Sequence, residues 1–213
     1  MSFINAHPVL LPVRSIGFRL LSIAVLLSLL LSACGEPDYT PKPRAFPRID
    51  FPQATTTARF DRDFCTFSFD YPAYADVRKD QTVFDEDALS DCWFDLHYPT
   101  LNASIYFSYV PVGEQPLEKL KQDAFKMTDW HTKKATYIDE IPFERDGIRG
   151  ILFRVEGPAA SPYQFYVTDT LGQHFLRGAL YVESKIQPDS LAPVYQFMKR
   201  DMDQVLATFA WND

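Results

Sequence analysis

The sequence has little cysteine, little glycine and no long apolar run. Its 213 residues include only 3 cysteines and 8 glycines. The main apolar stretch, residues 20–31, has about twelve residues, whereas a membrane-spanning helix needs roughly 20. A spanning helix is therefore not expected, and no glycine-rich phosphate loop is present.

Positive charge is also scarce. The chain carries 21 Lys and Arg against 28 Asp and Glu, a net charge of −7. Proteins that bind nucleic acid or anionic lipid headgroups usually do so through clustered basic residues. We therefore expect no nucleic acid among the partners.

Familiar catalytic and metal-binding motifs are missing too. Neither HExxH nor GxSxG occurs, and His97, His131 and His174 are far apart in the sequence. We expect no catalytic residues, no metal and no cofactor. A hydrolase, the alternative, would have to use Ser161, which could be exposed at the tip of the loop 157–162, or Asp169.

What is present at the N-terminus is a secretory signal. Arg14 and Arg19 form its positive end, and no acidic residue precedes Glu36. The apolar run and then small residues follow, up to Cys34. This order is typical of a cleaved signal peptide; a short uncleaved anchor helix is the alternative.

The residues that end this run, Leu31-Ser32-Ala33-Cys34, resemble the lipobox of bacterial lipoproteins. The resemblance implies a signal peptide over residues 1–33 and lipid on the Cys34 thiol. Two or three acyl chains hold a protein stably to a membrane. Since no aspartate directly follows Cys34, we expect the outer membrane, with the protein facing the periplasm.

Residues 34–63 are predicted to form a lipidated, proline-rich tether. Proline-rich chain is extended and semi-rigid, and the segment contains Pro37, Pro41, Pro43, Pro47 and Pro52. A pure spacer has no use for Phe46, Ile49 and Phe51. We therefore expect the second half of the tether to lie against the domain.

Cys65 and Cys92 remain after lipidation of Cys34. Disulfides form in the oxidising compartments that exported proteins reach, and both cysteines fall in phase with the apolar face of a predicted strand. We expect a disulfide, which would stabilise the fold by roughly 3–4 kcal/mol. A free buried pair and a metal site are the alternatives, although no His or Cys lies at ligand spacing.

Residues 64–213 show the periodicities of a mixed domain. Two-residue alternation predicts strands and three- to four-residue spacing predicts helices. Because hairpin strands make antiparallel sheets and one-sided helices need a face to cover, we predict an α+β fold: a central antiparallel β-sheet covered by helices. The predicted strands are 65–71, 92–98, 103–110, 135–143, 148–156, 163–169 and 174–183. The predicted helices begin at Pro116, for about 17 residues, and near Asp189 or Ser190. The order of elements is similar to the Mog1/PsbP-like sandwich.

One residue does not fit a simple strand pattern. Arg177 lies in the middle of the last predicted strand. We expect it to pair with a carboxylate across the sheet, with Asp169 as the nearest mate; a binding role on an exposed face is the alternative.

Several short segments of the sequence resemble those of one protein family. They are 38–44 (DYTPKPR), 48–50 (RID), 71–72 (YP), 150–152 (GIL), 157–161 (GPAAS), 164–169 (QFYVTD), 174–181 (HFLRGALY) and 189–194 (DSLAPV). In this order they resemble the gliding motility lipoprotein GldD of Bacteroidetes, over nearly all of the mature chain. The signal peptide is longer than expected for that family, which puts the start codon in question.

The resemblance implies a lipid-anchored, non-enzymatic component of the gliding machinery, tied to type IX protein secretion. Only Cys34 carries over as a functional position. The implied partners are other gliding and secretion proteins of the envelope, bound through an exposed sheet edge, the tether or Arg177. In the tether, the candidate contact residues are Tyr39, Pro41, Lys42 and Arg44. The alternative is a periplasmic module that binds a ligand or the cell wall in a pocket between sheet and helix.

Overall fold

The computed structural model describes Leu21 and residues 23–26, 48–53, 56–79, 82–83, 86–87, 90–113, 115–131 and 133–212. Leu21 and residues 23–26 are helical, and no helix in these ranges is long and apolar enough to cross a membrane. Cys34 and the tether candidates Tyr39, Pro41, Lys42 and Arg44 lie outside the described residues. The chain divides after Ala45, and the description below concerns the unit from Phe46 to Asp213.

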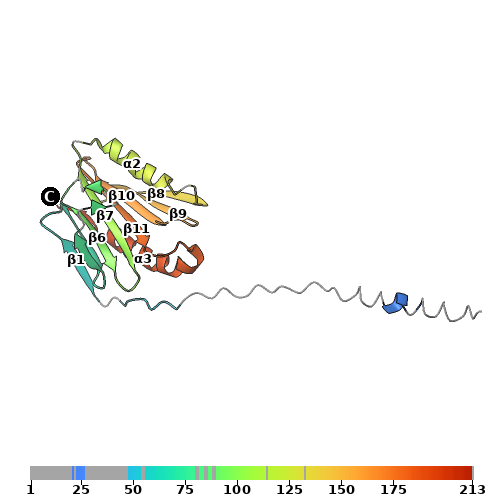
Figure 1. The fold of residues 1–213 in the computed structure, drawn as a ribbon. Coiled ribbons are helices and arrows are strands. Elements are labelled where there is room, and N and C mark those ends of the chain that lie inside the picture. The colour runs from blue at the N-terminus through green and yellow to red at the C-terminus, as the bar shows by residue number, and fades with distance from the viewer. Residues whose placement is uncertain are drawn as a thin grey trace, which may run out of the picture. The chain divides into compact units, whose positions relative to one another are not determined.

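An antiparallel sheet of seven strands forms the centre of this unit (Figure 1). Alternating apolar residues and tight turns build it, and Asp146 and Gly147 adopt positive φ between its strands β8 and β9. In spatial order the strands are β3 (Asp76–Lys79), β6 (Trp93–Tyr98), β7 (Ala103–Pro111), β11 (His174–Val182), β10 (Tyr163–Asp169), β9 (Ile148–Glu156) and β8 (Tyr137–Arg145).

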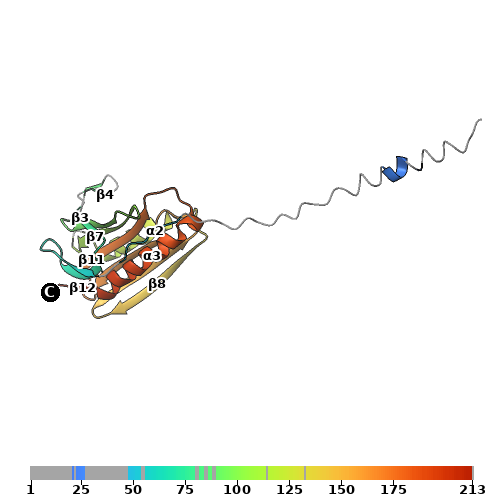
Figure 2. The ribbon, with the colours of Figure 1, turned by 90° about the horizontal axis from the view of Figure 1, so that it is seen from below.

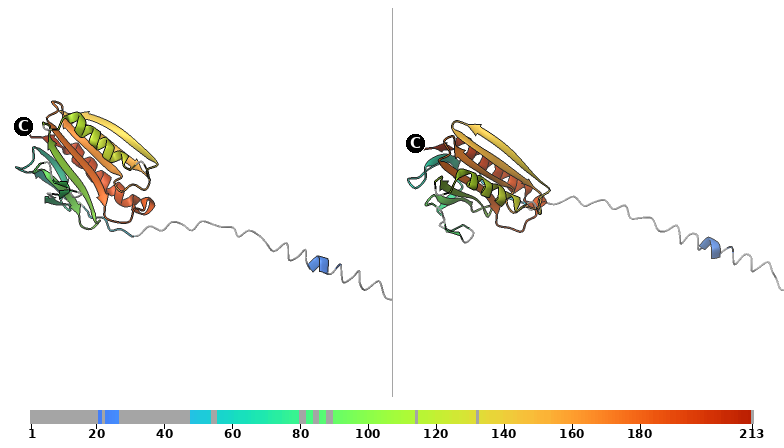
Figure 3. Two further views of the ribbon diagram at one scale, coloured as in Figure 1. Left: turned by 45° about the horizontal axis from the view of Figure 1, so that its top comes forward. Right: turned by 90° about the horizontal axis from the view of Figure 1, so that it is seen from above.

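Two helices cover opposite faces of the sheet. Helix α2 (Leu117–Asp129) lies on one face and helix α3 (Pro188–Thr208) on the other (Figures 2 and 3). A smaller sheet of β1 (Thr57–Asp61), β2 (Phe67–Pro72) and β12 (Ala210–Trp211) contributes to the core that includes α3. A short pair, β4 (Thr82–Val83) and β5 (Glu86–Asp87), stands apart. The predicted α+β class, with helices on a central antiparallel sheet, is confirmed.

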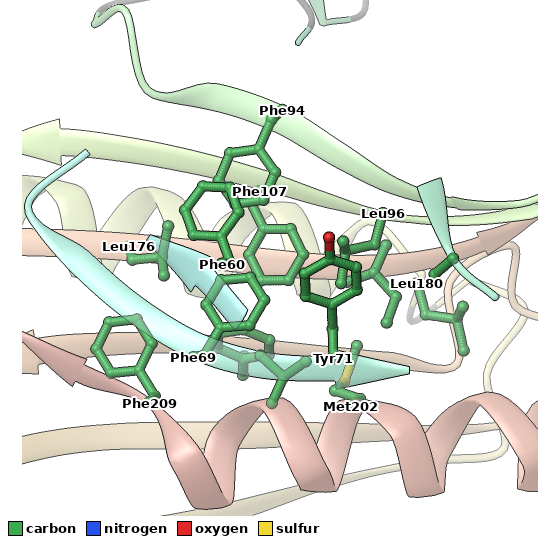
Figure 4. Packing of buried hydrophobic residues seen from close by; sticks show 14 of the residues in the cluster. Phe60, Phe69, Tyr71, Phe94, Leu96, Phe107, Leu176, Leu180, Met202 and Phe209 are labelled. Atoms are coloured by element: carbon green, nitrogen blue, oxygen red, sulfur yellow. The ribbon is translucent and has the colours of Figure 1, made fainter. Parts of the chain in front are cut away.

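The main core lies between the large sheet, the small sheet and α3, and it is built from stacked aromatic rings (Figure 4). Phe60 of β1 stacks on Phe94 of β6 with ring centroids 4.3 Å apart, and Phe94 stacks on Phe107 at 4.8 Å. Phe69 of β2 joins the same stack, 4.8 Å from Phe60. None of these four rings is more than 1% exposed. Offset-stacked rings add to the free energy of simple burial, so this stack joins the two sheets.

A disulfide ties the same two sheets together. Cys65 precedes β2 and Cys92 precedes β6, and their sulfurs are bonded with the Cα atoms 5.2 Å apart. Cys92 is 1% exposed. The predicted disulfide is therefore present, and it closes a loop that includes β3, β4 and β5.

Strand β1 lies within the range 34–63 that the sequence assigned to the tether. Its Phe60 is fully buried, and Ile49 and Phe51 pack against the core. Phe51 stacks on Phe197 of α3 at 4.8 Å. The second half of the tether therefore lies against the domain, as its apolar residues predicted.

Other boundaries differ from the prediction. The loop expected at 76–90 contains β3, β4 and β5, and β12 was not predicted. Helix α2 has 13 residues, so His131 lies beyond its end. Helix α3 begins at Pro188 with Gln187 as its N-cap. The predicted start near Asp189 or Ser190 lies one or two residues too late, because a proline at the first helical position starts the helix at Pro188.

Candidate functional site

The two faces of the large sheet differ in polarity because side chains alternate along each strand. In β7, Ile105 and Phe107 point to the main core, whereas Ser104 and Ser108 point to the α2 side. The strand register places Ser108 between Trp93 of β6 and Arg177 of β11. The α2 side of β6, β7 and β11 is therefore rich in polar groups.

Helix α2 covers only part of that side. Its Leu120 and Ala124 form a small apolar cluster with Phe153, Tyr166 and Phe175. Helix α2 packs on β10 and β11, so β6 and β7 lie beyond its main contact. The polar side chains of β6 and β7 on this side of the sheet are therefore candidates for a functional site.

A row of three polar side chains crosses β6 and β7 on this face. Ser104 Oγ lies 3.0 Å from His97 Nδ1 and donates to Asp95 Oδ2 at 3.3 Å. All three residues are buried. A nucleophilic serine needs the histidine as its base and the carboxylate behind the histidine. Here Ser104 lies between His97 and Asp95, and its hydroxyl proton is directed to Asp95. The three side chains therefore form a structural hydrogen-bond chain and not a catalytic triad.

A second polar group, called the Arg177 cluster below, gathers where α2 ends. It consists of Thr128, His131, Gln164, Arg177 and Tyr181. The Arg177 guanidinium donates through Nη2 to Gln164 Oε1 and interacts with the Tyr181 hydroxyl. The Thr128 hydroxyl donates to Ala124 O at 3.0 Å and lies 3.5 Å from the same Gln164 oxygen.

The cluster carries an uncompensated positive charge. Within the described residues no carboxylate lies within 4 Å of Arg177. Burial lowers the pKa of Arg177, an effect that Tyr181 opposes. Burial, and then the Arg177 charge, lower the pKa of His131, so His131 is neutral near pH 7. Charges that are largely shielded from solvent are normally paired, and Arg177 departs from this rule within the described residues.

Gln164 adds a second anomaly to the cluster. Its side chain is fully buried, and its Nε2 has no hydrogen-bond partner in the described part of the chain. The guanidinium holds the amide oxygen toward itself, because the opposite orientation would set two donors against each other. A buried amide donor without a partner costs about 1–3 kcal/mol.

The predicted mate of Arg177 was wrong. Asp169 faces its own hairpin turn: its Oδ1 accepts from the backbone N–H groups of Gln173 and His174 at 2.7 and 2.8 Å. Its Oδ2 accepts from Leu171 N at 3.1 Å. An aspartate that closes a turn over its own backbone is a common local structure, and it takes this carboxylate out of reach of Arg177.

The expected place of Ser161 was also wrong. The residue is fully buried, and its hydroxyl donates to Tyr163 O at 3.4 Å. His174 lies elsewhere, with Nδ1 2.7 Å from the Tyr109 hydroxyl. Within the described ranges, no group of three or more His, Cys, Asp and Glu side chains could hold a metal ion.

Two surface grooves flank the sheet. One, of about 360 Å³, lies between α2 and strands β8 to β10, with Lys121, Arg149 and Tyr166 among its lining residues. The other, of about 280 Å³, lies beside α3 and is lined partly by Tyr163 and Tyr195. The groove between α2 and strands β8 to β10 lies between sheet and helix. This is where the alternative hypothesis, a module that binds a ligand or the cell wall, places its pocket.

Strand β3 forms one edge of the large sheet, and strand β8 forms the other, longer edge. Its nine residues pair only with β9. Pro142 stands in its middle and lacks the N–H that an added strand would need, and Glu140 and Glu144 are exposed beside it. Proline and charge are common protections of sheet edges against pairing. The predicted edge is present, but it is poorly suited to accept a complete additional strand.

Exposed aromatic side chains occur near β8. Trp130, just after α2, is 69% exposed, and Tyr137, the first residue of β8, is 58% exposed. This contrasts with the aromatic rings of the main core, which are sealed from solvent. Trp and Tyr are enriched among residues that dominate protein interfaces.

The sequence showed parts of this site but not its composition. The sequence singled out Arg177 as a charge within an apolar strand. The alternation in residues 92–98 also places Asp95 and His97 on the face of the strand that Phe94 and Leu96 do not share. Gln164, Tyr181 and Thr128 carried no local signal. Only the pairing of β10 with β11 and the end point of α2 bring them to Arg177.

Three comparisons place the chain among known proteins. No curated protein sequence matches it. Among solved structures, the solution structure of cyanobacterial PsbP (CyanoP) from Synechocystis sp. PCC 6803 is similar, with 12% identity and a TM-score of 0.46, over 75% of this chain and 94% of that one. The family model described as gliding motility lipoprotein GldD matches residues 36–211. The chain therefore belongs to the GldD family of gliding motility lipoproteins.

Proposed function

We propose that the protein is a non-enzymatic assembly partner in the gliding machinery, associated with type IX protein secretion. Lipid on Cys34 holds it to the outer membrane, and its domain faces the periplasm. Membership of the GldD family supports a role in gliding motility. The non-enzymatic role, the tie to secretion and the membrane are our proposals.

The observation that carries the assembly role is the exposed pair Trp130 and Tyr137. Sixteen aromatic side chains of the described residues are buried, yet these two flank the connection between α2 and β8 with more than half of their surface exposed. Rigid aromatic side chains bury large contact areas at low entropic cost. We therefore assign a partner-binding role to this connection.

Affinity purification from crosslinked cells tests the proposal. The tagged protein is expected to recover envelope proteins of motility or secretion, and deletion of the gene is expected to abolish both spreading and secretion. Trp130→Ala combined with Tyr137→Ala should reduce the recovery at least tenfold. Leu171→Ala is the matched control, because Leu171 is 79% exposed in the β10–β11 turn. Recovery of no motility or secretion protein would contradict the proposal.

The alternative is a module that binds a ligand or the cell wall, and the groove between α2 and β8 favours it. Lys121 and Arg149 offer cations there, although both pair with glutamates. Purified cell-wall sacculi separate the two functions. Retention of the protein on sacculi that is lost in Tyr166→Ala, with no recovered envelope protein, would favour the alternative.

A further inference from the structure

We propose that the Arg177 cluster binds a carboxylate group. The proposal goes beyond the assembly role and does not depend on it. It rests on two neighbouring groups in the described part of the chain: the Arg177 guanidinium, whose charge has no carboxylate partner, and the amide nitrogen of Gln164, which has no acceptor.

The position of the cluster makes the site reachable. Arg177 retains intermediate exposure, and so do Tyr106, Ser108 and Tyr181 around it on the same face. Tyr106 and Tyr181 meet edge to face at 5.7 Å and form an aromatic wall. Helix α2 ends at Asp129, and His131 of the following connection also belongs to the cluster. In this proposal a small anionic group reaches the guanidinium past Ser108 of β7, which pairs with Arg177 in the sheet.

The charge of the cluster selects the class of anion. Arg177 is its one permanent cation, and His131 is neutral near pH 7 but can still donate through one ring N–H. A carboxylate, with one negative charge, neutralises one guanidinium and matches its two parallel donors. A phosphate monoester carries close to two negative charges and would leave one of them unpaired. The geometry therefore favours a carboxylate.

The fold does not require an arginine at this position. The small α2-side apolar cluster packs through Phe153, Tyr166 and Phe175 and does not include Arg177. Arg145, in contrast, donates to the backbone oxygens of Leu206 and Phe209 at the end of α3 and has an evident structural task. Arg177 instead contacts the side chains of Gln164 and Tyr181, and a partly buried cation without a carboxylate partner is typical of a binding site.

The test uses the mature lipoprotein in detergent micelles at pH 7 and constant ionic strength. Sodium acetate, the amide of N-acetylaspartate and sodium phosphate are each titrated against sodium chloride while the melting temperature Tm is measured. We expect a saturable rise in Tm with acetate and none with phosphate. A response to the aspartate derivative would identify acidic side chains as a source; a response to acetate alone would indicate free small carboxylates.

Two variants and one control make the test specific. Arg177→Gln should weaken the acetate response at least tenfold. Gln164→Glu places a carboxylate beside Arg177 within the chain, so it should raise Tm without acetate and abolish the response. Arg149→Gln, at an exposed arginine that pairs with Glu144, should respond like the wild type. No acetate response in the wild type, an equal response in Arg177→Gln, or an equal response to phosphate would overturn the inference.

This outcome is separable from the proposed function. If acetate binding fails while motility proteins are still recovered, only the carboxylate site is wrong. If acetate binds and no envelope protein is recovered, the assembly role is wrong and the site stands.

Discussion

On the α3 side of the large sheet, aromatic rings and a disulfide fill the space between two sheets and a helix. On the α2 side of the same strands, serines, a histidine, an aspartate and Arg177 share the surface with a shorter helix. The two faces differ because successive side chains of a strand point to opposite faces of the sheet. The comparison indicates that stability is concentrated on the α3 side, whereas the carboxylate site proposed above lies on the α2 side.

The largest effect is expected from Phe107→Ala. This ring is fully buried and stacks on Phe94 and Phe69 at 4.8 and 5.5 Å. Its loss should lower the free energy of unfolding by about 3–5 kcal/mol, through lost burial and a cavity. Tyr106→Ala, one residue away on the other face, should cost about 1 kcal/mol. Equal losses in urea denaturation would contradict the comparison.

Removal of the disulfide should come next. Cys65 and Cys92 are 27 residues apart in sequence, so replacing both with serine should lower the free energy of unfolding by about 3 kcal/mol, mainly because the unfolded chain gains freedom. The check is denaturation of the double variant beside the wild type. Dithiothreitol should destabilise the wild type and leave the variant unchanged; sensitivity of the variant would show a second cause.

A smaller effect on the free energy of unfolding is expected from a change of pH. It acts through Asp201 of α3, a buried carboxylate on the side of the sheet where aromatic residues form the core. Burial raises the pKa of Asp201 to about 6, although a 2.7 Å hydrogen bond from Tyr74 lowers it. The folded protein therefore binds more protons than the unfolded chain between about pH 4 and 6. The free energy of unfolding should fall as pH rises through this window.

The expected decrease is on the order of 1–2 kcal/mol after allowance for solvent screening. Asp201→Asn should remove this decrease in denaturation curves recorded from pH 4 to 7. Asp203→Asn, at a carboxylate that pairs with Lys199 on the helix surface, should keep it. The same pH profile in Asp201→Asn and the wild type would show that another group is responsible.

Phe51→Ala tests whether the tether contributes to the α3 side. Loss of its stack on Phe197 should lower the free energy of unfolding by about 1 kcal/mol. It should also speed proteolytic cleavage before β1, because the segment is then held less firmly. Arg48→Ala is the control: its pair with Asp50 is almost fully exposed and should contribute nothing measurable.

The smallest effect on stability is expected from Arg177→Met. Removal of the guanidinium relieves an uncompensated charge, but the buried Gln164 oxygen then loses its donor, which costs about 1–3 kcal/mol. Because these two effects oppose each other, the net change in the free energy of unfolding should be below about 1 kcal/mol. Arg145→Met should instead lose about 1–3 kcal/mol, because two backbone oxygens at the end of α3 lose their donor. A large loss in thermal or urea unfolding of Arg177→Met would mean that the α2 side also holds the fold.

The sequence predicted the framework of this molecule well, since periodicity determines which residues can face a core. Strands β9 and β10 agree with the predicted 148–156 and 163–169, and the disulfide followed from the cysteine count. The short strands β1, β3, β4, β5 and β12 were missed, because few residues reveal no period. Their pairing depends on contacts with distant parts of the chain.

The candidate site was less predictable for the same reason. Arg177 was visible as a charge within an apolar strand, but its partner was chosen by sequence proximity. Asp169 satisfies its own turn, and Gln164 reaches Arg177 only through the β10–β11 register. Residues that meet across a sheet are determined by register, which local sequence does not state.

The stack of Phe51 on Phe197 also determines how far the domain can reach. With lipid on Cys34, as proposed above, about 14 residues separate the membrane from Arg48, which extend to at most about 50 Å. If both Ile49 and Phe51 left the core, the chain up to Thr57 would add roughly 30 Å to this limit. The contacts of these two side chains therefore shorten the part of the tether that is available to extend.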